Sequence, residues 1–237
     1  MAKAGKIVAE VLKSLKGVII AGATTKEIEH FADGRIRALG GKSAFKGYRG
    51  YPASICTSIN EEVVHGIPSS RKLREGDIIS IDIGVYYEGF YGDAAYTFPV
   101  GIVDQETAKL LRVTEEALSR GIEMAVEGKR VYDVSHAIQE HVEKNGFSVV
   151  RTFVGHGIGR QLHEEPQVPN FGVAGQGPRL RQGMTLAIEP MVNSGTFDVR
   201  VLEDGWTAVT QDGKRSAHFE HTVVVMPNSA RILTNFN

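Results

Sequence analysis

Residues 73–82, LREGDIISID, and residues 180–189, LRQGMTLAIE, follow one pattern: Leu-Arg-x-Gly, four further residues, then Ile and a carboxylate. In each copy, a turn signal around the glycine precedes an apolar run that is typical of a buried strand, and the run ends in an acid. An ionised carboxylate is costly in such a place unless a positive group meets it. The pattern therefore predicts two equivalent strands, each of which brings an acid to a position that needs compensation.

A second echo upstream has nearly the same spacing. The first copy lies 107 positions before the second, and the upstream echo has a shift of 106: Gly22, Ile28, Ala32, Ile36 and Gly40 align with Gly128, Val134, Ile138, Val142 and Gly146. Coincidence is the alternative, and it would be favoured if only one short echo existed. Two echoes in the same order predict a duplicated unit, a single domain over residues 1–237 with pseudo-repeat halves of about 1–103 and 104–237.

Local signals predict helices and strands in the same order in both halves. The expected elements are an amphipathic helix over 3–16, a helix that Thr24 and Glu27 cap and that stops at Gly40-Gly41, strands over 48–97, a helix from Asp104, a helix over about 132–144, and strands from there to the C-terminus. This order is typical of an α+β fold. Without a low-complexity linker, we expect the halves to share one continuous sheet or an interface.

Composition indicates an ordinary globular protein. The chain has 42% hydrophobic and 23% charged residues, and Cys56 is its only cysteine, so it has no internal disulfide. The N-terminus lacks the continuous apolar core of a signal peptide, and no run reaches membrane-spanning length. We expect a soluble cytoplasmic protein with no membrane partner and no specific DNA partner.

The charge is unevenly distributed along the chain. The net charge is -1, but residues 1–49 contain ten Lys or Arg and four Asp or Glu. A basic N-terminal surface could contact RNA or a ribosome, whereas solvated helix faces explain such a bias more often. Both interpretations stay open.

Five residues stand out because they are acids or histidines in strand-like or glycine-rich sequence: Asp82, Asp93, His156, Glu189 and Glu220. Singly, each has an ordinary explanation, such as a solvent-facing strand position, a turn or an ion pair. Together, four carboxylates and one imidazole would repel one another without cations, and two divalent metals would resolve that conflict. Oxygen-rich ligation with one His and no thiolate suits Mn, Fe(II), Co or Zn.

The sequence around these residues resembles the methionine aminopeptidases. The motifs are IDIGVYYEGFYGDAAYTF, GHGIGRQLHEEP, IEPMV and FEHTVVV, together with CTSINEEVVHGIP, which contains His65. The likeness covers nearly the whole chain, shows no large insertion or extra N-terminal domain, and is nearest to the short bacterial-style type I enzymes. Such relatives usually have a short segment before the start of the match, so a trimmed N-terminus is one expectation. The resemblance implies the pita-bread fold, two αβ halves about a pseudo-two-fold axis.

The resemblance also implies a role for each candidate residue. Asp82 would bind one metal, His156 and Glu189 the other, and Asp93 and Glu220 would bridge them. Glu189 would accept a proton from the attacking water and pass it to the departing amine. His163 would stabilise the oxyanion and His65 would orient the scissile amide. The walls of the methionine pocket would include Tyr48, Tyr51, Cys56, Leu162 and Trp206, for which plain core packing is the alternative. Some family members have Phe at the position of Leu162 and Cys at the position of Phe45.

The implied activity is that of a methionyl aminopeptidase, a metallo-exopeptidase hydrolase that removes the initiator methionine from nascent proteins whose second residue is small. Its partners would be nascent N-termini and the ribosome, and we expect a monomer. Three alternative functions fit the sequence less well. GHGIG lacks the strand, Lys-Ser/Thr and helix of a phosphate-binding loop. A prolidase or aminopeptidase P usually has a further N-terminal domain. A non-catalytic binding protein of the same fold has typically lost ligands, whereas all five positions are filled here.

Overall fold

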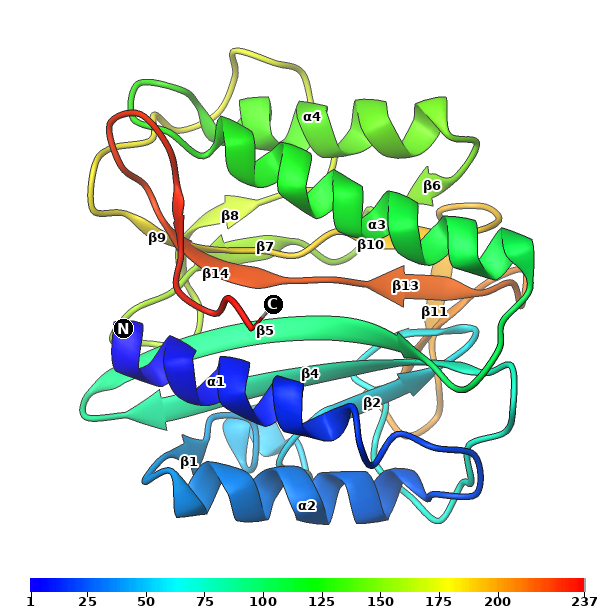
Figure 1. The fold of residues 1–237 in the computed structure, drawn as a ribbon. Coiled ribbons are helices and arrows are strands. Elements are labelled where there is room, and N and C mark those ends of the chain that lie inside the picture. Colours follow the sequence, from blue (N-terminus) through cyan, green and yellow to red (C-terminus); the bar gives the residue numbers. More distant parts are fainter. Residues whose placement is uncertain (237) are drawn as a thin grey trace.

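The computed structural model describes residues 1–236 and shows two helices followed by strands, twice along the chain (Figure 1). The helices are α1 (Ala2–Leu15), α2 (Thr25–Ala38), α3 (Gln105–Met124) and α4 (Val131–Lys144), with a 3-10 turn η1 (Tyr48–Gly50). The strands of the first half are β1 (Lys42–Ser43), β2 (Cys56–Ile59), β3 (Glu62–Val64), β4 (Ile78–Tyr87) and β5 (Phe90–Pro99). The strands of the second half are β6 (Ser148–Val149), β7 (Gly155–Gly157), β8 (Glu164–Val168), β9 (Thr185–Ile188), β10 (Met191–Asn193), β11 (Val199–Val201), β12 (Ala208–Thr210), β13 (Ser216–His218), β14 (His221–Val224) and β15 (Arg231–Ile232).

The helix predictions are confirmed, and their caps explain where the helices begin. The Thr24 hydroxyl accepts from the Glu27 N–H at 3.2 Å, and the Glu27 carboxylate accepts from the Thr24 N–H at 2.8 Å. The Asp104 carboxylate accepts from the Thr107 N–H at 2.7 Å and so caps α3. Among residues 1–236, no helix combines the length and the apolar character that crossing a bilayer requires.

The first half packs α1 and α2 against one side of a sheet of order β1-β4-β2, with β5 paired to β4. The strands β4 and β5 pair along ten residues each, from Ile78 with Pro99 to Tyr87 with Phe90. Apolar residues of α1 such as Val8 and Leu12 pack with Ile81 and Ile83 of β4 in one buried cluster. This cluster fixes β4 and β5 in place. Figure 1 shows α1 running along these two strands.

The second half repeats the arrangement with α3 and α4 on the opposite outer side of the molecule (Figure 1). Its sheets have the orders β15-β14-β9-β7-β8 and β13-β10-β6. Val113, Ile138, Ile188 and Phe219 are buried in one cluster that joins the two helices to these strands. The sheets of both halves therefore lie between two outer helical layers.

The halves meet at an interface instead of sharing one continuous sheet. Their main sheets are separate, although one small sheet, β11-β12-β3, contains strands from both halves. Across the interface, the Glu220 N–H donates to the Ala95 carbonyl at 2.9 Å, and the Thr97 hydroxyl donates to the His218 carbonyl at 2.8 Å. The sequence predicted either one continuous sheet or an interface between the halves, and the main sheets form an interface.

The repeated sequence positions have the same local structure. In the first half the Gly22 N–H donates to the Leu73 carbonyl at 2.8 Å, and in the second the Gly128 N–H donates to the Leu180 carbonyl at 3.1 Å. Gly22 and Gly128 have φ values of 91° and 87°, a left-handed conformation that favours glycine. The halves of about 1–103 and 104–237 remain a prediction, and these matched turns support it.

Candidate active site

The first half contributes two acids from adjacent strands. Asp82 lies in β4 and pairs with Ala95, and Asp93 lies in β5 and pairs with Gly84, so the two acids are diagonal neighbours on one face. The apolar run that ends at Asp82 is only part of this strand, since β4 continues to Tyr87. The ladder with β5 extends the strand past the acid, which places Asp82 in the middle of the sheet.

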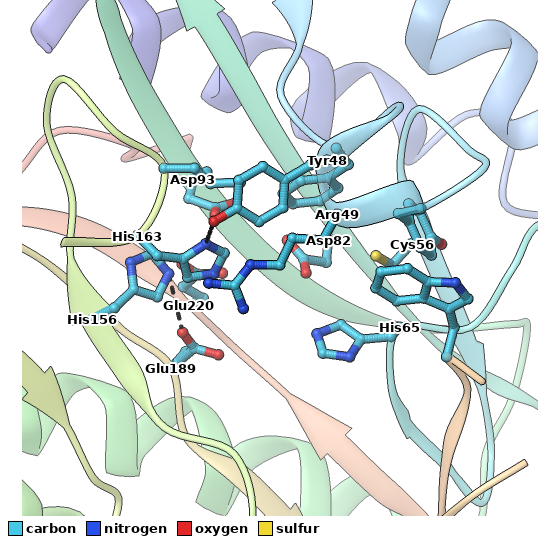
Figure 2. A pocket seen from close by; sticks show the side chains of 14 residues that line it. Tyr48, Arg49, Cys56, His65, Asp82, Asp93, His156, His163, Glu189 and Glu220 are labelled. Carbon is cyan, nitrogen blue, oxygen red and sulfur yellow. Dashed lines mark hydrogen bonds and ion pairs between the residues drawn. The ribbon is translucent and has the colours of Figure 1, made fainter.

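The second half contributes His156, Glu189 and Glu220 from three neighbouring segments. His156 lies in β7 and pairs with Ala187 of β9, Glu189 directly follows β9, and Glu220 stands between β13 and β14. The Nε2 atom of His156 lies 3.5 Å from Oε1 of Glu189. One ligand atom each of Asp93, His156 and Glu220 lie within 4.8 Å of one another. All five predicted residues line one pocket, where both halves meet (Figure 2).

Burial and mutual repulsion make this group of acids unfavourable when all are ionised. Burial raises the pKa of Asp93 to about 7. Burial first, and then the charge of Asp93, raises the pKa values of Asp82, Glu189 and Glu220 well above the usual carboxylate range. Because the four acids lie so close together, they do not ionise normally in the metal-free protein. A bound cation would restore their ionised form.

Several carboxyl oxygens in the pocket have no hydrogen-bond partner among the described residues, which shows whether the residues present fit a metal ion. Among residues 1–236, Asp82 Oδ1, Asp93 Oδ1 and Glu220 Oε1 are buried without a hydrogen-bond partner. Buried polar atoms rarely stay unpaired in native proteins unless an ion or water meets them. Several carboxylate oxygens and one imidazole nitrogen, with no thiolate among them, form a donor set for a divalent cation. The residues present therefore fit a metal site.

The two predicted substrate histidines also line the pocket. His65 directly follows β3 with φ of 61°, a strained conformation that occurs often at functional sites, and its ring meets Phe153 edge-on at 5.3 Å. His163 Nδ1 lies 2.8 Å from the Tyr48 hydroxyl, and its ring centroid lies 4.2 Å from that of His156. The side chain of His163 is exposed on one side only. Partial burial of the ring, together with the charges of His156 and Arg49, lowers the pKa of His163 to about 3, so the ring is neutral near pH 7.

An apolar wall adjoins the acids. Tyr51 meets Trp206 edge-on with ring centroids 5.1 Å apart, and its hydroxyl donates to the Gly66 carbonyl at 2.9 Å. Cys56 of β2 is buried directly opposite Asp82, and burial raises the pKa of its thiol. Leu162 is buried and lines the same pocket. The predicted wall residues thus face the cavity, and this surface can accept an apolar side chain.

Three residues at or beside the pocket were not among the predicted site residues. Phe45 and Arg49 line it, and Arg49 follows the predicted Tyr48 in η1. The Nε2 atom of His218 lies 3.7 Å from Oε2 of Glu189 and has no hydrogen-bond partner among residues 1–236. His218 ends β13 two residues before Glu220, so strand alternation was a signal that could have placed both on one side.

Comparison with known proteins gives consistent matches along the chain. The model of metallopeptidase family M24 matches residues 1–227. The chain is 55% identical to a methionine aminopeptidase of Clostridium perfringens, over 99% of this chain and 94% of that protein. It is 53% identical to methionine aminopeptidase 1 of Bacillus subtilis, with the same coverage of both chains.

Solved structures give the same picture. A methionine aminopeptidase from Thermotoga maritima superposes with a TM-score of 0.98 at 54% identity, over 99% of this chain and 95% of that one. A prolidase from Pyrococcus horikoshii has a TM-score of 0.81 at 20% identity. The superposition covers 100% of this chain and 61% of the prolidase chain. The prolidase shares the fold alone.

Proposed function

Because the chain belongs to metallopeptidase family M24 and, within it, to the methionine aminopeptidases, we propose that it removes the initiator methionine from nascent proteins whose second residue is small. The observation that carries the proposal is the junction of two surfaces in one pocket. Acids with buried, unpartnered oxygens lie on one side, and an apolar wall of aromatic and aliphatic side chains lies on the other. This arrangement suits a metal-dependent reaction at the end of a chain that begins with an apolar side chain.

We propose that Asp82, Asp93, His156, Glu189 and Glu220 hold two divalent ions, which Mn, Fe(II), Co or Zn could supply. Asp93 and Glu220 would be shared between the two ions. Divalent cations in such a site polarise a carbonyl and lower the pKa of an attacking water. The unpartnered oxygens of Asp82, Asp93 and Glu220 support this assignment, because a bound cation would give each of them a partner.

Glu189 would accept the proton of the attacking water and pass it to the departing amine. Glu189 lines the pocket and lies 3.5 Å from His156, so its carboxylate is within reach of a water held among the acids. The Asn170 side-chain amide donates to the Glu189 carbonyl at 3.0 Å and fixes the backbone that carries the carboxylate. Proton transfer would therefore take place at a positioned group.

His163 would stabilise the developing oxyanion as a neutral donor. If its Nδ1 accepts a hydrogen bond from the Tyr48 hydroxyl, its Nε2 carries the hydrogen and is the free donor of the ring. His65 would orient the scissile amide from the other side of the pocket. Its lowered pKa, caused by burial, leaves it neutral as well. Two neutral rings avoid repelling the cations that the acids require.

The methionine side chain would lie against Tyr51, Cys56, Leu162 and Trp206, with Tyr48 at the edge. These side chains are apolar or polarisable where they face the cavity, and a thioether packs well on aromatic surfaces. The free amine of the substrate would meet the acidic side of the pocket. The substrates would be nascent N-termini that the enzyme meets in the cytoplasm as a monomer, beside the ribosome.

Release of methionine from Met-Ala-Ser tests the proposal. The protein is treated with EDTA, and Mn²⁺, anaerobic Fe²⁺, Co²⁺ or Zn²⁺ is then added while free methionine is measured. We expect no release without metal, release with at least one ion, and far slower release from Met-Leu-Ser. Ala-Pro, a substrate suited to a proline-specific peptidase of this fold, should not be cleaved. If no ion supported the release of methionine from Met-Ala-Ser, the proposed aminopeptidase function would be rejected.

A further inference from the structure

Arg49 lies at the mouth of the pocket in an unusual backbone conformation. It is the central residue of η1 and has φ of 50°, in the left-handed region that a residue with a side chain seldom adopts. Its guanidinium carbon lies 5.4 Å from the ring centroid of Tyr48. Figure 2 shows the side chain beside Tyr48, with its guanidinium directed into the pocket toward His163. The conformation of η1 therefore aims Arg49 at the site.

The guanidinium of Arg49 lies near the ring of Tyr48 but has no anionic partner in the described part of the chain. Among residues 1–236, no carboxylate forms an ion pair with its guanidinium, and no hydrogen bond to it is present. It is the only Lys or Arg among the described residues that line this pocket. An arginine that is aimed into a cavity with its donors free is suited to bind an external acceptor, and carboxylates match its planar fork.

The exposed side of the pocket shows where a bound peptide must leave. Of the lining residues, only Arg49 and His163 are exposed, and the others are buried or half-buried. In the proposed function, on which this inference rests, the first residue is held between the acids and the apolar wall. The chain after the second residue then passes Arg49 and His163. Because an extended chain rises about 3.3 Å per residue, the third residue is within reach of a long arginine side chain.

We propose that Arg49 binds a carboxylate on the third residue of the substrate, so that the enzyme favours N-termini of the form Met-small-acidic. The acceptor on a nascent chain is an Asp or Glu side chain, and on a free tripeptide it is also the C-terminal carboxylate. Arg49 is thus a specificity residue that acts beyond the methionine and the small second residue. The ordinary alternative is that Arg49 only packs on Tyr48.

Three C-terminally amidated peptides separate these roles: Met-Ala-Asp-Gly-amide, Met-Ala-Asn-Gly-amide and Met-Ala-Lys-Gly-amide. With metal-loaded enzyme we expect kcat/KM for the Asp peptide to exceed that for the Asn peptide about fivefold, the upper end for a solvent-accessible ion pair. The ratio should fall to about one in Arg49→Gln, and Arg49→Glu should favour the Lys peptide. Raising the ionic strength should shrink the wild-type ratio. Unamidated Met-Ala-Ser compared with its amide tests the C-terminal carboxylate separately.

Arg160→Gln is the matched control. Arg160 is also exposed, lies three residues before His163, and places its guanidinium carbon 5.1 Å from the ring centroid of Phe90, outside the pocket lining. This variant removes the same charge and should keep the wild-type Asp/Asn ratio. An equal loss of the ratio in Arg160→Gln, or an unchanged ratio in Arg49→Gln, would overturn the inference.

A binding measurement keeps this test apart from that of the proposed function. Calorimetric Kd values for Ala-Asp-Gly-amide and Ala-Asn-Gly-amide, on metal-loaded wild-type and Arg49→Gln protein, do not require turnover. We expect tighter binding of the Asp peptide by wild type alone. Equal Kd values reject the role of Arg49 even where methionine is released, whereas failure to release methionine from the neutral peptide counts against the proposed function.

Discussion

The hydroxyl of Thr222 makes two hydrogen bonds with the backbone of Asp93: it accepts from the Asp93 N–H at 3.0 Å and donates to the Asp93 carbonyl at 2.7 Å. Thr222 is fully buried in β14 of the second half, and Asp93 lies in β5 of the first half. One side chain of the second half thus fixes the backbone beneath an acid of the first half. The stability of the interface and the position of this acid are therefore linked.

Replacing Thr222 with Val should destabilise the protein and weaken metal binding together. The side chains have similar shapes, but Val leaves the buried N–H and carbonyl of Asp93 without this partner, at about 1–3 kcal/mol for each group. We expect the free energy of unfolding in urea to fall by about 2–6 kcal/mol and the Kd for Mn²⁺ to rise. Thr222→Ser keeps the hydroxyl and should retain Mn²⁺ affinity. Equal Mn²⁺ affinity in wild type and Thr222→Val would contradict the link.

Metal-free protein should become less stable as the pH rises from about 4 to about 7. The pKa of Asp93 is raised by burial from 3.8 to about 7, so in this range the folded state binds a proton that the unfolded state has released. The stabilising effect is complete below the unfolded pKa and is lost as the pH passes through the folded pKa. Asp93→Asn should flatten this dependence and stabilise metal-free protein at pH 7.5 by on the order of 1–3 kcal/mol.

Urea denaturation in EDTA across pH 4–8 measures this effect. Asp82, Glu189 and Glu220 have raised pKa values too, so the variant should reduce the slope without removing it. Glu106→Gln, at an exposed position in the first turn of α3, is the control and should keep the wild-type slope. An identical slope in Asp93→Asn would show that its carboxyl titrates normally.

His163→Ala should reduce turnover far more than stability. The residue is exposed, so its removal should leave the thermal midpoint nearly unchanged, whereas loss of one preorganised oxyanion donor lowers kcat about 100- to 1000-fold. Because its pKa is lowered to about 3, the ring should cause no step in kcat between pH 5 and 9. Methionine release from Met-Ala-Ser across this range, with thermal unfolding of the same samples, checks both statements. If His163→Ala kept half of the wild-type kcat, His163 would not be the donor that stabilises the oxyanion.

Tyr48→Phe should have a smaller effect of the same kind. The Tyr48 hydroxyl is the partner of His163 Nδ1 at 2.8 Å, and without it both ring tautomers become accessible. We expect kcat to fall about tenfold, which corresponds to the roughly 1.4 kcal/mol that one hydrogen bond contributes, with KM changed less. In His163→Ala, the additional change Tyr48→Phe should have almost no effect, because the two residues act through one hydrogen bond. If the two losses in kcat were fully additive in the double variant, Tyr48 would not act through His163.

Local signals were sufficient for the helices but not for the full length of the central strands. Thr24 with Glu27, and Asp104, are caps that depend only on residues three positions away, and the structure contains both. By contrast, the apolar run that indicates β4 stops at Asp82 and does not show how far the strand extends. It continues because β5 supplies a complete antiparallel partner, and such pairing is decided by distant sequence.

The same difference applies to the pocket. Its acids and histidines could be identified from the sequence because charged and polar side chains are unusual in apolar, strand-like segments. Arg49 could not, since an arginine in a basic N-terminal segment is ordinary until the structure shows that its side chain lines the pocket beside Tyr48. Phe45 was noted only as a departure from other family members, and its place in the cavity depends on how closely β4 approaches it.

Gly84→Ala should narrow the pocket through Phe45. Gly84 is the β4 residue that pairs with Asp93, and a Cβ atom built on it would lie against the Phe45 ring, 2.9 Å from Cδ1, and 3.0 Å from the Cβ of Ala44. The ring must move, and overpacking of this kind costs about 1–3 kcal/mol of stability. Because Phe45 lines the pocket, we expect KM for Met-Ala-Ser to rise about fivefold or more, the equivalent of about 1 kcal/mol. The second change Phe45→Leu should recover part of both losses in the Gly84→Ala background but not in wild type, since a smaller side chain makes room for the added methyl group. A Gly84→Ala protein with the wild-type thermal midpoint and KM would show that Phe45 can turn away freely, and that β4 does not set the shape of the methionine pocket.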